Sequence, residues 1–217
     1  MNRKVGKKIG SLILSVILLV TISIPVFAVE DETIEPHIDF VAGMKLIVNP
    51  TITIDYSGSG IGFGHACLVF INRSHNTITV GNMSVYAGDA VTIGTFGNRS
   101  SHKGIWYNIE ACKGMGSSYY GLTTAVTATE LLNINNVINS NDSWSVSNNC
   151  ASFAVKVWNA GNSGRPVSGN NPIELAGSIT SYSDYNKNPE IPLRFQGDIA
   201  RHTPNGVVFD PSGYYDI

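Results

Sequence analysis

The sequence predicts a single α+β domain in which strands come first along the chain and helices follow. Short runs rich in β-branched residues, separated by Gly, Asn and Pro, extend from Met44 to Val126 and are typical of antiparallel strands. Segments after Val126 instead repeat apolar residues at the 3.6-residue period of a helix. We find no internal repeat and no second domain boundary, so residues 44–217 are interpreted as one domain.

The first 28 residues have the three parts of a secretory signal peptide. Four basic residues precede an apolar run from Ile9 to Ile24, and small residues at Val26 and Ala28 suit cleavage after Ala28. The alternative is an uncleaved anchor, because the run approaches the length that spans a membrane. Residues 29–43 are expected to be a flexible lead-in. We therefore expect a secreted or envelope-associated protein with no stable membrane span after cleavage.

Charge also limits the kinds of partner that the protein is expected to bind. Loss of the four basic residues of the leader takes the formal net charge from −2 to −6. No basic run remains in the mature chain, which argues against nucleic acid or an anionic membrane as a partner.

The expected strands and helices alternate with polar turns. Strands are predicted at residues 44–48, 51–56, 64–71, 77–80, 83–86, 90–95, 104–112, 122–126 and 206–209. The three between 77 and 95 are interpreted as an antiparallel meander. Helices are predicted at 127–140, which opens with a capping-box pattern, at 150–161 and at 172–181. Trp144 and Val146 are expected to be buried in the connection before the second helix.

Cys150 is the strongest candidate for a nucleophile. It follows Ser147, Asn148 and Asn149, all of which cap helices well, and it lies in the first turn of the predicted helix. The free N–H groups there and the helix dipole favour a thiolate over a thiol. The alternative is a small core residue, since free cysteine is among the most buried types. With Cys67 and Cys112 the cysteine count is odd, so at least one thiol is free unless pairing is intermolecular.

His65 is the strongest candidate for the base that would activate this thiol. It begins the apolar run 64–71, and alternation places Cys67 and Val69 on the same strand face. A helix packed on that face would carry Cys150 to the start of the strand. The alternative is a strand-end histidine with a structural role. His102 is a less favoured candidate in a loop. Three further histidines are interpreted as surface residues: His37, His75 and His202.

The sequence GHACL at 64–68, followed downstream by NCASF at 149–153, resembles the circularly permuted NlpC-type members of the papain-like cysteine hydrolases. In ordinary papain-like chains the cysteine helix precedes the histidine strand. The permuted group, which includes lecithin retinol acyltransferase-like proteins, reverses this order. The resemblance covers residues 62–160. It implies a Cys-bearing helix packed on an antiparallel sheet, with Cys150 as nucleophile and His65 as base.

The same resemblance implies a polar residue that orients the imidazole. Residues 105–111 resemble the family's short strand ending in Glu-Ala, which selects Glu110, and alternation would place Trp106, Asn108 and Glu110 on one face. Asn108 and His102 are the alternatives, because more strands separate this segment from His65 than the family usually has. Glu110 could equally be a solvated strand-end carboxylate.

The sequence thus predicts an exported cysteine-dependent amidase or peptidase, or an acyltransferase, acting on peptide, peptidoglycan or acyl substrates of the cell envelope. No cofactor or metal is expected, because the chain has neither CxxC nor HExxH spacing. The alternative is a non-catalytic binding or immunity-type module on the same fold. The choice between hydrolysis and acyl transfer, the substrate and the oligomeric state stay open.

Overall fold

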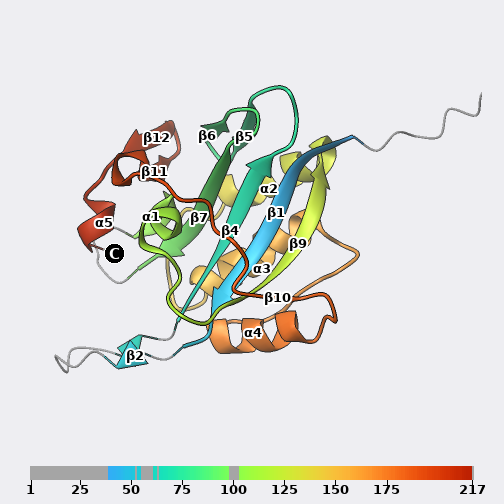
Figure 1. Ribbon diagram of the computed structural model, residues 1–217. Coiled ribbons are helices and arrows are strands. Elements are labelled where there is room, and N and C mark those ends of the chain that lie inside the picture. The colour runs from blue at the N-terminus through green and yellow to red at the C-terminus, as the bar shows by residue number, and fades with distance from the viewer. Residues whose placement is uncertain (1–38, 52, 55–60, 63, 98–102, 217) are drawn as a thin grey trace, which may run out of the picture. The chain divides into compact units, whose positions relative to one another are not determined.

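The computed structural model describes residues 39–51, 53–54, 61–62, 64–97 and 103–216, all within the compact unit Ile38–Ile217. This unit is α+β, with a large antiparallel sheet and five α-helices in the described residues (Figure 1). The predicted signal peptide, most of the predicted lead-in, His37 and His102 lie outside the described residues.

The main sheet has eight strands in the order β10-β9-β1-β4-β7-β8-β11-β12, and every neighbouring pair is antiparallel. Its strands are β1 (Phe40–Asn49), β4 (His65–Asn72), β7 (Ala90–Phe96), β8 (Gly104–Tyr107), β9 (Tyr120–Thr127), β10 (Asn186–Lys187), β11 (Ala200–Thr203) and β12 (Gly206–Phe209). Two hairpins are not part of it: β2 (Thr53–Ile54) with β3 (Ile61–Gly62), and β5 (Ile78–Val80) with β6 (Met83–Val85).

The predicted meander between residues 77 and 95 is correct for its first two strands and wrong for the third. Strands β5 and β6 pair only with each other, whereas β7 returns to the main sheet and pairs with β4. The buried side chain of Asn72 fixes the segment that carries β5 and β6, because its Nδ2 donates to the carbonyls of Asn76 at 2.7 Å and Val85 at 2.9 Å. Local alternation predicts the strands correctly, but their partners depend on this tertiary contact.

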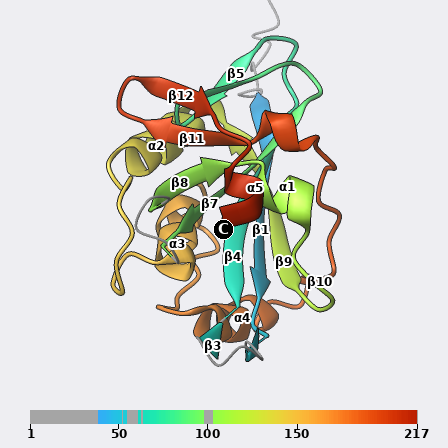
Figure 2. The ribbon, with the colours of Figure 1, turned by 90° about the vertical axis from the view of Figure 1, so that its left-hand side faces the viewer.

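Helices α2 (Ala128–Asn139) and α3 (Cys150–Gly161) cover one face of the sheet, and Figure 2 shows both on the side opposite α1. Both predicted helix starts are confirmed. Thr127 and Glu130 form the capping box of α2, and Asn149 caps α3. The predicted third helix is α4 (Pro172–Thr180), which begins with proline and is capped by Asn171.

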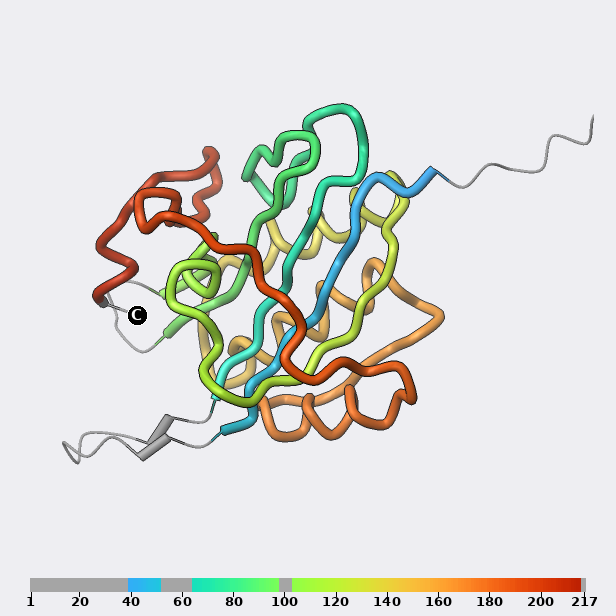
Figure 3. Tube along the Cα trace, in the orientation of Figure 1, coloured from blue at the N-terminus to red at the C-terminus, as the bar shows by residue number. Residues whose placement is uncertain are grey.

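The opposite face of the sheet carries α1 (Ile109–Lys113) and the chain that follows β10. Figure 3 shows this segment crossing the face on its way to β11, after which the chain ends in α5 (Gly213–Asp216). A short 3-10 helix, Gln196–Asp198, precedes β11. Lys45 Nζ donates to the carbonyl of Glu190 at 2.9 Å, and the N–H of Arg194 donates to the carbonyl of Ala111 at 3.2 Å. These contacts fix the crossing segment over the sheet.

Several expectations from the sequence are corrected by the structure. Strand β1 begins at Phe40, so the end of the predicted lead-in 29–43 is already part of the sheet. Val146 is exposed rather than buried, because it lies at the tip of the turn before α3. His202 was expected on the surface, yet it is buried on β11, where its Nδ1 lies 2.9 Å from Tyr107 Oη. The unpredicted pairing of β11 with β8 explains its burial.

No helix in the described part of the chain is both long and apolar enough to cross a membrane.

Candidate active site

The N-terminus of α3 is built by a side-chain cap, which places Cys150 as the first helical residue. Asn149 Oδ1 accepts hydrogen bonds from the N–H groups of Ala151 at 3.0 Å and Ser152 at 3.1 Å. Ser152 Oγ accepts in return from the N–H of Asn149 at 2.9 Å. The capping box therefore fixes the turn at Cys150 and gives its sulfur the positive end of the helix dipole.

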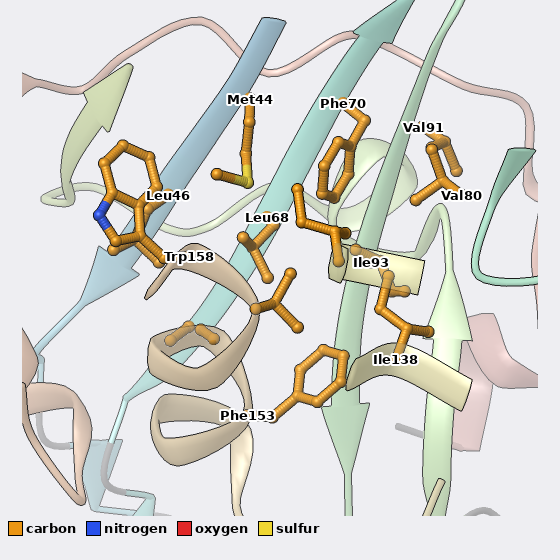
Figure 4. Packing of buried hydrophobic residues seen from close by; sticks show 14 of the residues in the cluster. Met44, Leu46, Leu68, Phe70, Val80, Val91, Ile93, Ile138, Phe153 and Trp158 are labelled. Atoms are coloured by element: carbon orange, nitrogen blue, oxygen red, sulfur yellow. The ribbon is translucent and has the colours of Figure 1, made fainter. Parts of the chain in front are cut away.

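The sequence predicted the wrong sheet face for this helix. We expected α3 on the face that carries His65, Cys67 and Val69. Instead, Phe153 and Trp158 of α3 pack in the same core as Leu68 and Phe70, which point to the other face of β4 (Figure 4). Periodicity identifies which residues share a strand face, but not which face receives the helix.

Cys150 still reaches His65, because β4 and β7 separate at this end of the sheet. Their pairing ends at Cys67 and Gly94, while β7 continues beside β8 to Phe96. Past that point the backbone N–H of Ala66 on β4 donates to the sulfur of Cys150, and the His65 side chain forms a hydrogen bond with it. The two residues thus meet at the end of β4 although their elements pack on different faces.

Glu110 holds the other side of the His65 imidazole. His65 Nε2 lies 2.7 Å from Glu110 Oε1, and the Glu110 side chain is only 2% exposed. The ring also stacks on Phe96, with centroids 4.6 Å apart and an interplanar angle of 25°. Because a carboxylate accepts the Nε2 proton, Nδ1 is left to face the thiol of Cys150.

Glu110 reaches this position from a helix, whereas the sequence predicted a strand over 104–112. Strand β8 ends at Tyr107, Asn108 adopts a left-handed conformation with φ 64°, and α1 begins at Ile109. Asparagine tolerates this conformation better than most residues. The turn directs Glu110 towards β7, so Trp106, Asn108 and Glu110 do not share a strand face.

The alternative Asn108 has a different role from the one considered. Its Oδ1 accepts from the N–H of Thr92 at 3.3 Å, and its Nδ2 donates to the carbonyl of Asp198 at 3.0 Å. It thus joins the start of α1 to β7 and to the segment before β11. Of the three candidates for the third residue, Glu110 is the one that the described structure places against His65; His102 lies outside the described residues.

Thr92 and Gly94 of β7 also surround the site, and the sequence reasoning missed both. Thr92 Oγ1 donates to Glu110 Oε2 at 3.0 Å, and Gly94 lies under the Glu110 carboxylate. A polar residue and a glycine two positions apart in an apolar strand were the available signal, because residues i and i+2 share a face.

The electrostatics favour a thiolate and an imidazolium. Burial by itself raises the pKa of Cys150, but the hydrogen bond and charge of His65 and the N–H groups of Ala66 and Ala151 lower it below the ordinary thiol value. Burial likewise lowers the pKa of His65, yet its hydrogen bonds and charge interactions with Cys150 and Glu110 raise it to about 10. His65 is therefore charged near neutral pH, and its charge favours the thiolate form of Cys150.

The other two cysteines differ from Cys150 in environment. All three are free thiols, so Cys67 and Cys112 do not form a disulfide. Burial, and then the charges of Glu110 and Cys150, raise the pKa of Cys67 well above the ordinary value. Burial also raises the pKa of Cys112, whose Sγ donates to the carbonyl of Phe195 at 3.3 Å.

A pocket of about 240 Å³ opens beside the imidazole. Its described lining residues are His65, Phe96, Ile109, Glu110, Lys113, Gly114 and Met115. Phenylalanine, isoleucine and methionine give it apolar walls, and Lys113 adds one cationic group. The described residues contain no group of three or more His, Cys, Asp or Glu side chains that could hold a metal ion.

Comparisons with protein-family models, curated proteins and solved structures find no match for this chain.

Proposed function

We propose that the protein is a cysteine-dependent hydrolase, an amidase or peptidase with acyl transfer as a related activity, of the circularly permuted papain-like type. The observation that carries this proposal is the continuous contact from Cys150 through His65 to the buried Glu110. A thiol becomes a strong nucleophile when a base holds its proton and a third group orients that base.

The chemistry begins with the Cys150 thiolate attacking the carbonyl carbon of an amide or ester. The cap uses the N–H groups of Ala151 and Ser152, so the N–H of Cys150 itself is the first-turn donor suited to bind the oxyanion. The His65 imidazolium gives its Nδ1 proton to the leaving amine or alcohol, which departs and leaves a thioester on Cys150. Neutral His65 then takes a proton from water, or from another nucleophile that receives the acyl group. The deprotonated nucleophile attacks the thioester, the acyl product leaves, and the Cys150 thiolate is restored.

The substrate class follows from the predicted leader and not from the site itself. A signal peptide over residues 1–28 would send the mature chain out of the cytoplasm, where peptide amides of the cell envelope are the abundant targets. The apolar pocket beside His65 is open to a small side chain of such a substrate. We therefore propose a secreted or envelope-associated enzyme that acts on peptidoglycan peptides or on other envelope amides and esters.

The test is the rate of iodoacetamide labelling of each cysteine against pH, with the labelled peptides mapped by mass. We expect Cys150 to label fast well below the ordinary thiol pKa of about 8.5, because its thiolate is already formed. His65→Ala should slow it by at least tenfold at pH 7, since a raised thiol pKa reduces the thiolate fraction by that factor per unit. Cys150→Ala should abolish release of peptides from peptidoglycan while the protein stays folded.

Cys112→Ala is the matched control, because it removes another partly exposed thiol outside the contact chain. It should leave both the Cys150 profile and peptide release unchanged. Full peptide release by Cys150→Ala, or a Cys150 that labels no faster than Cys112, would contradict the mechanism. A non-catalytic binding module on this fold would then be the better hypothesis.

A further inference from the structure

Strand β7 carries two residues that the core does not require. Val91 and Ile93 point into the main core, as expected for a central strand. Thr92 and Gly94 point to the opposite face, beside Val69 and Cys67 of β4. A buried hydroxyl and a glycine both weaken a strand, unless something on that face needs them. Glu110 of α1 is the group that contacts both positions.

Thr92 completes the hydrogen bonding of the Glu110 carboxylate. One carboxylate oxygen, Oε1, binds His65 Nε2 at 2.7 Å, and the other, Oε2, accepts from Thr92 Oγ1 at 3.0 Å. Thr92 is fully buried and Glu110 is 2% exposed, so water has little access to either oxygen. With one donor on each oxygen, the plane of the carboxylate is fixed relative to the imidazole.

Gly94 supplies the space in which the carboxylate lies. A Cβ built at this position would come 2.2 Å from Glu110 Oε1 and 3.1 Å from His65 Nε2. Its backbone conformation is an ordinary strand one, so the requirement for glycine is one of room. An alanine here would push Glu110 away from His65, or push both of them off β7.

We propose that Thr92 and Gly94 form a seat for the Glu110 carboxylate, and that Thr92 acts as a positioning residue for the Cys150–His65 pair. This inference rests on the proposed function, because it assigns a role within the same site. Thr92 touches neither substrate nor thiol in this scheme. It acts through Glu110, which keeps the proton of the imidazole on Nε2 and Nδ1 towards Cys150.

The first experiment compares Thr92→Val with wild type in the rate of iodoacetamide labelling of Cys150 against pH. Valine keeps the shape of threonine and removes the hydroxyl. We expect labelling at pH 7 to fall about tenfold and the midpoint to move to higher pH, the size expected for loss of one hydrogen bond to a charged group. Thr92→Ser, which restores the hydroxyl, should return the rate to within about twofold of wild type.

Thr95→Val is the matched control on the same strand. Thr95 is also buried, but its Oγ1 donates to the backbone carbonyl of Gly104 at 3.1 Å and not to Glu110. Its replacement should lower stability as Thr92→Val does, without moving the labelling profile of Cys150. Equal shifts in the two variants would overturn the proposal in favour of a general effect of β7. Should Thr92→Val not fold, Thr92→Ala fits the same space and answers the same question.

A double substitution separates positioning from packing. If Thr92 acts only through the carboxylate, Thr92→Val should change the profile of Glu110→Gln little, although it changes that of wild type. If the effects of Thr92→Val and Glu110→Gln on the labelling profile are fully additive, Thr92 does not act through Glu110, and the proposal is overturned. A wild-type profile that already follows an ordinary thiol would overturn the nucleophile and this inference together. If Cys150 of wild type labels well below the ordinary thiol pKa and Thr92→Val leaves that labelling profile unchanged, the role of Thr92 and Gly94 is overturned and the nucleophile is not.

Discussion

At the scale of single residues, burial and charge act in opposite directions on His65. Burial disfavours an imidazolium, whereas the Cys150 thiolate and the Glu110 carboxylate each stabilise it, and the pKa of His65 ends near 10. The same contacts lower the pKa of Cys150 against the effect of burial. The two groups therefore titrate as a pair, and each one holds the other in its charged form.

This coupling predicts how the imidazole titrates. In wild type, ¹⁵N NMR of His65 should show the imidazolium up to a midpoint near pH 10, because its pKa is raised to about that value. Cys150→Ala removes the larger of the two stabilising partners, so the midpoint should fall furthest in that variant. Glu110→Gln should lower it by a smaller amount, because the glutamine oxygen still accepts from Nε2 without a charge.

The titration also distinguishes a thiolate–imidazolium pair from a neutral thiol beside a neutral imidazole. An imidazole that loses its proton near its ordinary pKa of about 6.5 in wild type would mean that the thiolate and carboxylate do not act on it. The exposed His75 follows the end of β4 opposite to the end that carries His65. Its ring signals serve as an internal reference in the same spectra.

At the scale of elements, α3 connects stability to reactivity through its cap. Asn149 accepts from two backbone N–H groups of the first turn, and its Nδ2 donates to the carbonyls of Val146 at 2.9 Å and Asn170 at 2.7 Å. The residue therefore fixes the helix start and two adjoining loops together. Cys150 is the next residue, so any fraying of this turn moves the sulfur away from His65.

Asn149→Ala is expected to lower the free energy of unfolding by about 1 kcal/mol, the usual size for a lost asparagine cap. It should also slow the labelling of Cys150 at pH 7. Asn171→Ala is the comparison, because Asn171 caps α4 by accepting from the N–H of Glu174 at 2.9 Å. Urea unfolding should give similar losses for both variants, with slower labelling in Asn149→Ala alone. Equal labelling in the two would show that the cap does not position the thiol.

At the scale of the whole molecule, the site joins residues from helices on the two opposite faces of the sheet. Helix α3 lies on one face and α1 on the other, as Figure 2 shows. They contribute Cys150 and Glu110 to opposite sides of the same imidazole, which is carried by the end of β4. The separation of β4 from β7 past Cys67 and Gly94 makes this meeting possible.

Strand β1 pairs with β4 on one side and β9 on the other, which limits how far the chain can be shortened from its N-terminal side. Cleavage of the predicted leader after Ala28 would give a protein that begins at Val29, as its intact mass would show. A chain starting at Leu46 should show no cooperative unfolding transition in urea, because it lacks six of the ten residues of β1, a strand paired with both β4 and β9. A cooperative urea transition for this shortened chain would contradict the expectation.

Much of the local structure could be predicted from the sequence. The starts of α2 and α3, the buried strand at His65 and the strand β12 all lie where short-range patterns predict them. Caps, turns and alternation are interactions between residues close in the chain, so the sequence displays them directly. The choice of Cys150, His65 and Glu110 also came from the sequence, through short motifs and a family resemblance.

Other contacts between distant residues could be found only in the tertiary structure. The sheet face that α3 covers, the pairing of β7 with β4, the burial of His202 and the helix that carries Glu110 all depend on such contacts. The seat of Thr92 and Gly94 is of the same kind, since each lies at least 16 residues from Glu110 in sequence. The sequence by itself therefore determined which residues have suitable chemistry. Only the folded sheet decided which of them touch, because strand pairing and helix docking depend on packing across the whole domain.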